Sequence, residues 1–406
     1  MNIYAYMDSK AAEYNHFDPQ RAPRLFARLA SHLKLPSFKI HIIGTNGKGS
    51  VGRFLAQSLR ESGYSIMHFT SPHLFDFKER FDLGEGAVSL DALEGAHAFL
   101  QKFEFIHEAS YFEYATFLAL VLAMDCDFLI MEAGVGGEYD STSVIPYDVT
   151  VFTKIGLDHS DLLGDSIESI ALTKLRAAQG EIFCHFQSEV VLGMLARLDS
   201  LVSEAMDSIP RPIPPNPPLG KHYLSAPDVE AIANAHDYPR FLLENLALAK
   251  LVLDYIAKKS MPVSLTTSRL RLRGRCEILE DSILLDVGHN EMAALAVLEE
   301  MKRFCGGGRF SLIYNSYKNK AVETLLRIFS PAIDELIIFE VSNPRIIDQA
   351  DLVDIARKLG LKPRIFSLED QARGVKDDLI KSKKYLVFGS FSLVENFLLW
   401  HKRIST

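Results

Sequence analysis

Short apolar runs alternate with longer segments of helical periodicity in the N-terminal part of the chain. Helices are expected at Ser50–Ser62, which ends at a glycine, and at the strongly apolar Tyr114–Met124. Between such segments lie mostly apolar runs that predict buried strands: Phe38–Ile43, Tyr64–Phe69, Phe128–Glu132 and Val149–Ile155. This alternation is typical of a mostly parallel sheet covered by helices.

The alternation is interrupted at Ile209–Gly220, where six of the twelve residues are proline. Because proline lacks a backbone N–H and fixes φ, the segment is expected to be an extended surface loop. A proline-rich docking motif is the alternative. Helical periodicity returns at Tyr238–Ala257, and Lys258–Thr267 is expected to connect two domains.

A second series of strands and helices follows the connector. Helices are expected at Glu291–Phe304 and Asp351–Leu359, and strands at Ile283–Val287, Phe310–Tyr314, Glu335–Val341 and Tyr385–Phe388. A chain of 406 residues is long enough for two cores. The sequence therefore predicts an α/β protein with an N-terminal mostly parallel sheet domain of phosphate-loop type at residues 1–260. A smaller C-terminal Rossmann-like α/β domain is expected at residues 268–406.

Composition narrows the class of protein. The formal net charge of −8 argues against a nucleic-acid-binding surface, which needs clustered Lys and Arg. The four cysteines are scattered without a C-x-x-C pair, so neither a disulfide framework nor a structural zinc site is expected. No apolar stretch is long enough to span a membrane, and the N-terminus lacks the pattern of a signal peptide. A cytoplasmic protein is expected.

The first predicted strand leads into a glycine-rich turn in the run HIIGTNGKGSV, His41–Val51. Glycines allow the backbone to bend tightly and to aim N–H groups at phosphate oxygens, while Lys48 neutralises phosphate charge and Ser50 can hold Mg²⁺. An ordinary strand–helix connection is the alternative, because Ile42 and Gly49 depart from the usual G-x-x-x-x-G-K-[ST] spacing. The candidate nucleotide-binding residues are Gly44, Thr45, Asn46, Gly47, Lys48, Gly49 and Ser50.

Polar residues terminate three further strands. Glu132 ends FLIMEAG, Asp158 and His159 follow the next strand, and Ser71 follows the strand ending at Phe69. Carboxylates at the carboxyl edge of a parallel sheet are suited to metal or ligand binding. Structural roles are the alternatives: Glu132 could cap a helix or bond the glycine turn, His159 could be a satisfied structural histidine, and Ser71 could be a turn former.

Seven motifs occur in an order and spacing that resemble the folylpolyglutamate synthase/dihydrofolate synthase family of the Mur ligase superfamily. They are GTNGKGSV, TSPHLFDFKERF, SYFEYATF, MEAGVGGEYDSTSV, IGLDHSDLLGDSIESIALTK, LRGRCEIL and LLDVGHN. The resemblance implies a ligase that uses ATP, a pterin-bearing carboxylic acid and L-glutamate, with chemistry in the cleft between two domains. ATP would convert the carboxylate into an acyl phosphate, which the glutamate amine then attacks.

The resemblance also implies two Mg²⁺ sites. Ser71 and Glu132 match the ligands of one, to which Ser50 could contribute, and Glu132 and His159 match those of the second. Lys174, in IALTKLRAAQG, matches a lysine that the family carries as a carbamate. Carbamylation would replace a cation beside two metal ions with an anion. A solvated helix lysine is the alternative. With Lys48, the residues Glu132, His159 and Lys174 form the expected catalytic set.

Further nucleotide contacts implied by the resemblance come from later in the chain. Asn245 matches an adenine-side asparagine, Arg275 a phosphate-binding arginine, and Asp286 with His289 a ribose and phosphate edge. The alternatives are a polar helix face for Asn245, a surface ion pair for Arg275 and a helix cap for Asp286.

Pterin contacts are implied less specifically, and Phe112 could equally be an ordinary core residue. The expected contacts are Phe17, Asp18, Ser110, Phe112, Glu113, Asp140 and Ser141. The chain departs from the family pattern at several positions, which leaves substrate preference open: Glu138, Ser141, Ser143, Leu242, Glu291 and the segment SYKNK around Lys318.

We therefore expect a monomeric ligase that joins L-glutamate to dihydropteroate, to reduced folates or to both, without a nucleic-acid or membrane partner. Two alternatives remain open at this point. One is a Mur-type ligase acting on another carboxylic acid, against which TSPHL and SYFEY argue. The other is a nucleotide-binding protein without catalysis, which the intact Lys48, Glu132 and His159 disfavour.

Overall fold

The chain divides into two compact units in the computed structural model, which describes residues 1–406 except 12–16, 207–214, 234–236, 374–382 and 406. The N-terminal unit comprises Met1–Tyr238 and Leu242–Arg271, and the C-terminal unit comprises Pro239–Phe241 and Leu272–Thr406. The segment Lys258–Thr267, expected as a connector, lies in the N-terminal unit, where the Thr266 backbone N–H donates to Ser58 Oγ at 2.9 Å.

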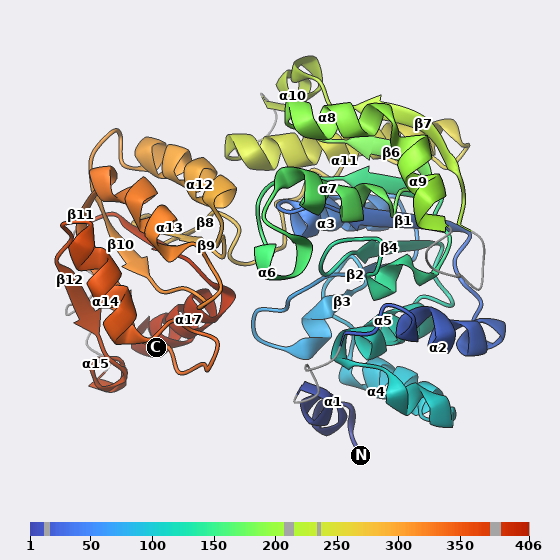
Figure 1. Ribbon diagram of the computed structural model, residues 1–406, viewed down its shortest axis with the longest axis horizontal. Coiled ribbons are helices and arrows are strands. Elements are labelled where there is room, and N and C mark those ends of the chain that lie inside the picture. Colours follow the sequence, from blue (N-terminus) through green and yellow to red (C-terminus); the bar gives the residue numbers. More distant parts are fainter. Residues whose placement is uncertain (12–16, 207–214, 234–236, 374–382, 406) are drawn as a thin grey trace. The chain divides into compact units, whose positions relative to one another are not determined.

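The N-terminal unit is built on a sheet whose described strands run in the order β3-β2-β4-β1-β5-β6-β7 (Figure 1). All neighbouring pairs are parallel except β2 with β3. The strands are β1 Phe38–Ile43, β2 Ile66–Phe69, β3 Phe81–Asp82, β4 Phe128–Glu132, β5 Val149–Phe152, β6 Gly180–Cys184 and β7 Pro218–Tyr223.

Helices cover both faces of this sheet. Successive strand side chains point to opposite faces, so Phe128 and Ile130 of β4 join one apolar cluster while Leu129 and Met131 join another. The first cluster contains residues of α3 and α11, and the second contains residues of α1, α2, α4 and α5. The described helices of this unit are α1 Ile3–Ala11, α2 Arg21–Leu29, α3 Lys48–Glu61, α4 Leu90–Leu100, α5 Tyr111–Leu122, α6 Ser160–Leu163, α7 Ile167–Leu175, α8 Glu189–Ala196, α9 Leu198–Met206, α10 Ala226–Ala233 and α11 Arg240–Lys258.

The expectation of an irregular loop at Ile209–Gly220 is wrong at its C-terminal end. Pro218–Gly220 opens strand β7, which pairs with β6 in parallel at the edge of the sheet. Proline is tolerated at the first residue of an edge strand because no ladder hydrogen bond from its nitrogen is needed there. Residues 209–214 of this segment lie outside the described part of the chain.

The C-terminal unit contains a second mostly parallel sheet. Its described strands follow the order β12-β11-β10-β13-β9-β8, with β8 antiparallel to β9. They are β8 Glu277–Leu279, β9 Ile283–Asp286, β10 Phe310–Tyr314, β11 Ile333–Phe339, β12 Pro363–Phe366 and β13 Tyr385–Phe388. The described helices are α12 Glu291–Phe304, α13 Val322–Phe329, α14 Gln349–Lys358, α15 Leu368–Arg373 and α17 Phe391–Ser405. The predicted α/β class, with two mostly parallel sheets, is confirmed.

None of the helices in the described ranges combines the length and the apolar character that a membrane crossing requires.

Candidate nucleotide and metal site

Four adjacent parallel strands end at the same edge of the N-terminal sheet, in the order β2, β4, β1 and β5. The glycine-rich turn follows β1, Glu132 is the last residue of β4, and Ser71 comes shortly after β2. Asp158 and His159 come after β5. The fold therefore places the polar strand ends predicted from the sequence along one carboxyl edge, where open α/β sheets bind ligands.

The glycine turn is held close to the segment that follows β5. A Cβ on Gly44 would lie 2.0 Å from Thr153 Oγ1, so only glycine fits this approach. The backbone N–H groups of Thr45 and Asn46 donate to the carbonyl of Lys154 at 2.9 and 3.2 Å. Gly47 has a φ of 92° at the N-cap of α3, a conformation that favours glycine. The turn thus directs the positive end of α3 at this edge.

Two lysine amines converge on one carbonyl of this turn. Lys48 Nζ donates to Gly44 O at 3.2 Å, and Lys174 Nζ of α7 donates to the same oxygen at 3.0 Å. Burial, followed by the positive charge of Lys48, lowers the pKa of the Lys174 amine from 10.5 to about 7. The Lys174 side chain is buried, so the alternative of a solvated helix lysine does not hold.

Glu132 and Ser71 are brought into direct contact. The Thr70 hydroxyl donates a hydrogen bond to Glu132 Oε2, and the Ser71 backbone N–H donates to the same oxygen at 3.3 Å. The two residues that follow β2 thus orient the buried carboxylate. Carboxylate and hydroxyl oxygens are the donors that Mg²⁺ prefers, so these residues fit a divalent cation.

His159 adopts a left-handed backbone conformation with a φ of 53°, directly before the short helix α6. Its backbone N–H donates to Asp158 Oδ1 at 2.8 Å, and its Nε2 lies 4.0 Å from Asp158 Oδ2. Within the described ranges, no group of three or more His, Cys, Asp or Glu side chains is arranged to hold a metal ion. A cation at this edge therefore needs hydroxyl, water or phosphate oxygens as well.

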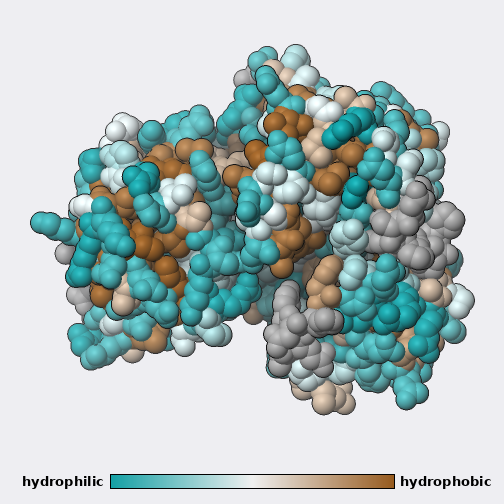
Figure 2. Space-filling model, in the orientation of Figure 1, coloured by the Kyte–Doolittle hydropathy of each residue, from teal (hydrophilic) through white to brown (hydrophobic). Residues whose placement is uncertain are grey.

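The segment around His159 exposes apolar side chains alongside the polar Ser160 and Asp161. Leu157 and Leu162 flank it in sequence, and Leu162 is 67% exposed. Figure 2 shows brown, hydrophobic residues in the region where Figure 1 draws α6.

Asn245 of α11 lies beside the glycine turn. A Cβ on Gly47 would lie 2.6 Å from Asn245 Oδ1, and the asparagine is buried. The side chain therefore does not lie on the solvent-exposed face of its helix, which was the alternative considered for it.

The C-terminal unit gathers Arg275, Asp286 and His289 near Phe391. The Arg275 guanidinium carbon lies 5.2 Å from the centroid of the Phe391 ring, and the His289 ring lies 6.3 Å from it. Burial raises the pKa of Asp286, an effect that the Arg275 charge opposes. Asp286 accepts hydrogen bonds from the N–H groups of Cys276 and Gly288, and Asn290 caps α12.

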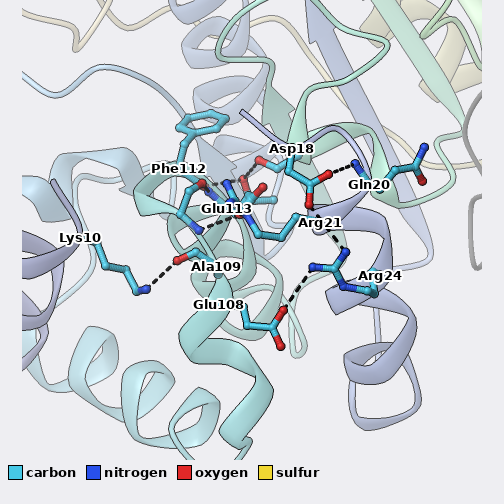
Figure 3. A network of polar contacts seen from close by, with 12 residues as sticks. Lys10, Asp18, Gln20, Arg21, Arg24, Glu108, Ala109, Phe112 and Glu113 are labelled. Atoms are coloured by element: carbon cyan, nitrogen blue, oxygen red, sulfur yellow. Dashed lines mark hydrogen bonds and ion pairs between the residues drawn. The ribbon is translucent and has the colours of Figure 1, made fainter. Parts of the chain in front are cut away.

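Four of the predicted pterin contacts belong to, or adjoin in sequence, a network of polar contacts that joins α2 to the start of α5 (Figure 3). Glu113 Oε2 accepts from Arg21 Nε and from the Ser110 N–H, both at 2.7 Å, and Ser110 is the N-cap of α5. This reciprocal cap starts α5 at Tyr111, three residues before the predicted start. Asp18 lies 3.7 Å from Arg24, and Phe17 is 71% exposed.

The remaining predicted pterin contacts, Phe112, Asp140 and Ser141, pack against or are hydrogen-bonded to nearby residues. A Cβ on Gly134 would lie 2.6 Å from the Phe112 ring, so the outer edge of this ring packs closely against the turn after β4. Asp140 accepts from the N–H groups of Gly134 and Val135 at 3.0 Å. The hydroxyls of Ser141 and Thr116 are 2.7 Å apart.

Sequence reasoning missed Arg21, Thr70 and Thr153. Arg21 orients Glu113, Thr70 orients Glu132, and Thr153 sets the spacing of the glycine turn. Thr70 could have been found from its place at a strand end. Arg21 and Thr153 meet their partners only through long-range contacts that no local pattern indicates.

Comparison with known proteins first assigns the class. The model of the Mur ligase middle domain matches residues 42–192, which extend from β1 into α8. The structure of Helicobacter pylori folylpolyglutamate synthetase is 34% identical to this chain in sequence. The match covers 99% of this chain and 98% of that one, with a TM-score of 0.73. The chain belongs to the folylpolyglutamate synthase/dihydrofolate synthase family of ATP-dependent ligases.

Two further relatives agree with this assignment. The dihydrofolate synthase/folylpolyglutamate synthase of Buchnera aphidicola subsp. Schizaphis graminum is 28% identical to this chain. The match covers 92% of this chain and 91% of the relative. The structure of the bifunctional folylpolyglutamate synthase/dihydrofolate synthase of Yersinia pestis, complexed with AMPPNP and Mn ion, is 22% identical to this chain. The match covers 98% of this chain and 97% of that one, with a TM-score of 0.78. This second likeness concerns the fold alone.

Proposed function

We propose that this chain joins L-glutamate to dihydropteroate, to reduced folates or to both, through an acyl phosphate formed with ATP. The observation that carries the proposal is the arrangement of Lys48, Lys174 and the glycine turn around Gly44 O at the carboxyl edge of the sheet. The Lys48 amine beside a helix N-terminus forms a positive site, as a triphosphate requires, and the Lys174 amine is buried next to it.

Phosphoryl transfer depends on positioning and charge neutralisation. Lys48 and the N–H groups from Gly44 to Ser50 would bind the phosphates, and Asn245 would lie on the adenine side. Glu132, held by Thr70 and Ser71, would direct its carboxylate at the cation. Mg²⁺, when bound, would supply further neutralisation of phosphate charge. We propose two Mg²⁺ sites, one held by Ser71 and Glu132 with a contribution from Ser50, and the other held by Glu132 and His159.

Lys174 is proposed to act as a carbamate. Its amine is buried beside Lys48 and has a pKa of about 7, so a neutral, nucleophilic fraction exists near neutral pH. The neutral nitrogen would attack the carbon of CO₂ and form an N–C bond, while one C–O π pair moves onto oxygen and one proton leaves to solvent. Together with the proton that the ammonium has already lost, this leaves an anion in place of a cation. Lys174→Ala should lose turnover and regain part of it with short carboxylic acids. Full activity of the variant would reject the carbamate.

The remaining predicted site residues stay proposals. Arg275, Asp286 and His289 of the C-terminal unit are proposed as further nucleotide contacts. The pterin is proposed to contact the side chains around the start of α5 and the turn after β4: Phe17, Asp18, Ser110, Phe112, Glu113, Asp140 and Ser141. Monomeric state and cytoplasmic location are also proposed.

The decisive experiment incubates the purified chain with ATP, Mg²⁺ and labelled glutamate, and offers dihydropteroate or a reduced folate in separate reactions. ADP release that depends on both organic substrates, together with a labelled product, is the expected result. Product mass distinguishes single from repeated glutamate addition. ADP release without an acceptor would instead indicate an uncoupled ATPase, and nucleotide binding without any ADP would indicate a protein that has lost catalysis.

A further inference from the structure

The turn after β4 is pressed against the end of the helix that carries Lys174. A Cβ on Gly137 would lie 3.0 Å from the Thr173 carbonyl oxygen and 3.2 Å from Lys174 Cα. The Glu138 N–H donates to the Thr173 carbonyl at 2.7 Å. This bond satisfies one of the carbonyls that the last turn of a helix leaves without an intrahelical partner.

The same two segments also carry opposite charges. Arg176, the C-cap residue of α7, lies two positions after Lys174, and its Nη1 is 3.7 Å from Glu138 Oε2. The Glu138 side chain is only 2% exposed and that of Arg176 is 23% exposed. Burial of a carboxylate to this extent is costly unless the carboxylate is paired with a cation or hydrogen-bonded. Arg176 also contacts Glu204 of α9 at 2.9 Å, but that carboxylate is 54% exposed.

We propose that Glu138 and Arg176 are positioning residues for the ligase reaction, because their ion pair fixes the end of α7 and so places Lys174 on the phosphate-binding turn. The pair acts together with two backbone features, the close approach at Gly137 and the Glu138 to Thr173 hydrogen bond. From this position of the helix end, Lys174 Nζ reaches Gly44 O at 3.0 Å. The inference rests on the proposed function, since it assigns these side chains a part in that reaction.

The ion pair can be removed by side-chain substitutions that leave the two backbone contacts in place, and Glu138→Gln does so without a change in side-chain shape. Glu138→Gln and Arg176→Gln delete one charge each, and the double variant deletes both. Arg176→Lys keeps the positive charge. Glu204→Gln is the matched control, because it removes the exposed partner of the same arginine. All variants are assayed as the full chain, with thermal unfolding measured in parallel to establish that each is folded.

We expect Glu138→Gln and Arg176→Gln each to lower kcat about tenfold, since displacement of a positioned group by a fraction of an ångström is costly to turnover. The double variant should be no slower than the single variants, because both remove the same interaction. KM for the pterin substrate should stay within about twofold, and Arg176→Lys should recover most of kcat. Glu204→Gln should match the wild-type chain.

A second measurement does not depend on activity. Hydrogen exchange at residues 134–138 and 172–176 should quicken in Glu138→Gln and stay at the wild-type rate in Glu204→Gln. Folded Glu138→Gln protein with wild-type kcat, multiplicative losses in the double variant, or an equal loss in Glu204→Gln would each overturn the proposal. Wild-type protein without any ligation would overturn the proposed function itself, whereas an active wild type with insensitive variants would overturn only the positioning role.

Discussion

At the scale of single residues, the most informative feature is the pair of lysines that share the Gly44 carbonyl. Two like charges in a buried site repel each other, and one peptide oxygen offsets little of that repulsion. The arrangement becomes favourable when an anion occupies the turn or when one amine loses its charge. Both outcomes fit a site for phosphates, and the lowered pKa of Lys174 indicates which amine yields its proton.

The lowered pKa has a consequence for stability. Because the amine titrates near 7 in the folded chain and near 10.5 in the unfolded chain, the unfolded state binds the extra proton between these values. Stability should therefore rise with pH across this window, by up to about 1.4 kcal/mol per pH unit, and the full penalty should apply below pH 7. In Lys174→Met, this contribution to the rise should disappear.

The measurement is chemical unfolding in CO₂-free buffer near pH 7 and near pH 9, for the wild-type chain and for Lys174→Met. Lys250→Met on α11, which removes a lysine with an exposed side chain, is the control. Parallel pH profiles for the wild type and Lys174→Met would contradict the expectation.

The residues predicted from the sequence were those whose chemistry depends on local pattern. Lys48 and Glu132 follow from a strand, a glycine turn and a strand end, which a sequence displays directly. The partners of Glu113 and Gly44 could not be predicted, because Arg21 lies 92 residues from Glu113 and Thr153 approaches from a neighbouring strand. Such contacts depend on the packed structure.

At the scale of elements, the sequence predicts whether a segment is a helix or a strand better than it predicts the residues at which the element begins and ends. The strands β10 and β13 and the helix α12 have the predicted bounds. The start of α5 was missed because apolar periodicity begins at Tyr114, whereas the helix is initiated earlier by the reciprocal cap between Ser110 and Glu113. The proline-rich pattern does not predict β7, because a proline at the first residue of an edge strand needs no ladder hydrogen bond from its nitrogen.

The same substitution, glycine to alanine, should change the stability of the chain in opposite directions at Gly95 in α4 and at Gly137 in the turn after β4. Gly95 is exposed within α4 and a Cβ there meets nothing within 4 Å, so Gly95→Ala should stabilise the chain by about 0.5 to 1 kcal/mol. Gly137→Ala should destabilise it, because its Cβ meets the Thr173 carbonyl and the Lys174 backbone.

Thermal unfolding of both variants checks this, and ligase turnover adds a second readout. Gly137→Ala should also lose turnover, since its clash displaces the end of α7, while Gly95→Ala should keep it. Equal effects of the two substitutions would mean that the close approach at Gly137 does not constrain the helix.

At the scale of the whole molecule, much of the proposed nucleotide site belongs to one compact unit. The glycine turn, Lys174, Glu132 and Asn245 all lie within the N-terminal unit, although they are spread over half of the chain. The sheet accounts for this, because parallel strands that are distant in sequence end at a common edge. Occupation of the site by nucleotide should therefore stabilise the N-terminal unit directly.

Binding to the folded state alone stabilises it by an amount set by ligand concentration, about 2.7 kcal/mol at a hundred times Kd. ATP with Mg²⁺, in the absence of glutamate and pterin, should thus raise the Tm of the wild-type chain in a concentration-dependent manner. Lys48→Ala should remain folded without nucleotide, because the hydrogen bonds of its amine go to carbonyls of the turn and its charge repels the Lys174 amine, but it should show little Tm shift with nucleotide. Lys250→Ala should respond as the wild type does. A shift of wild-type size in Lys48→Ala would place the nucleotide elsewhere and would remove the phosphate-binding role of the glycine turn.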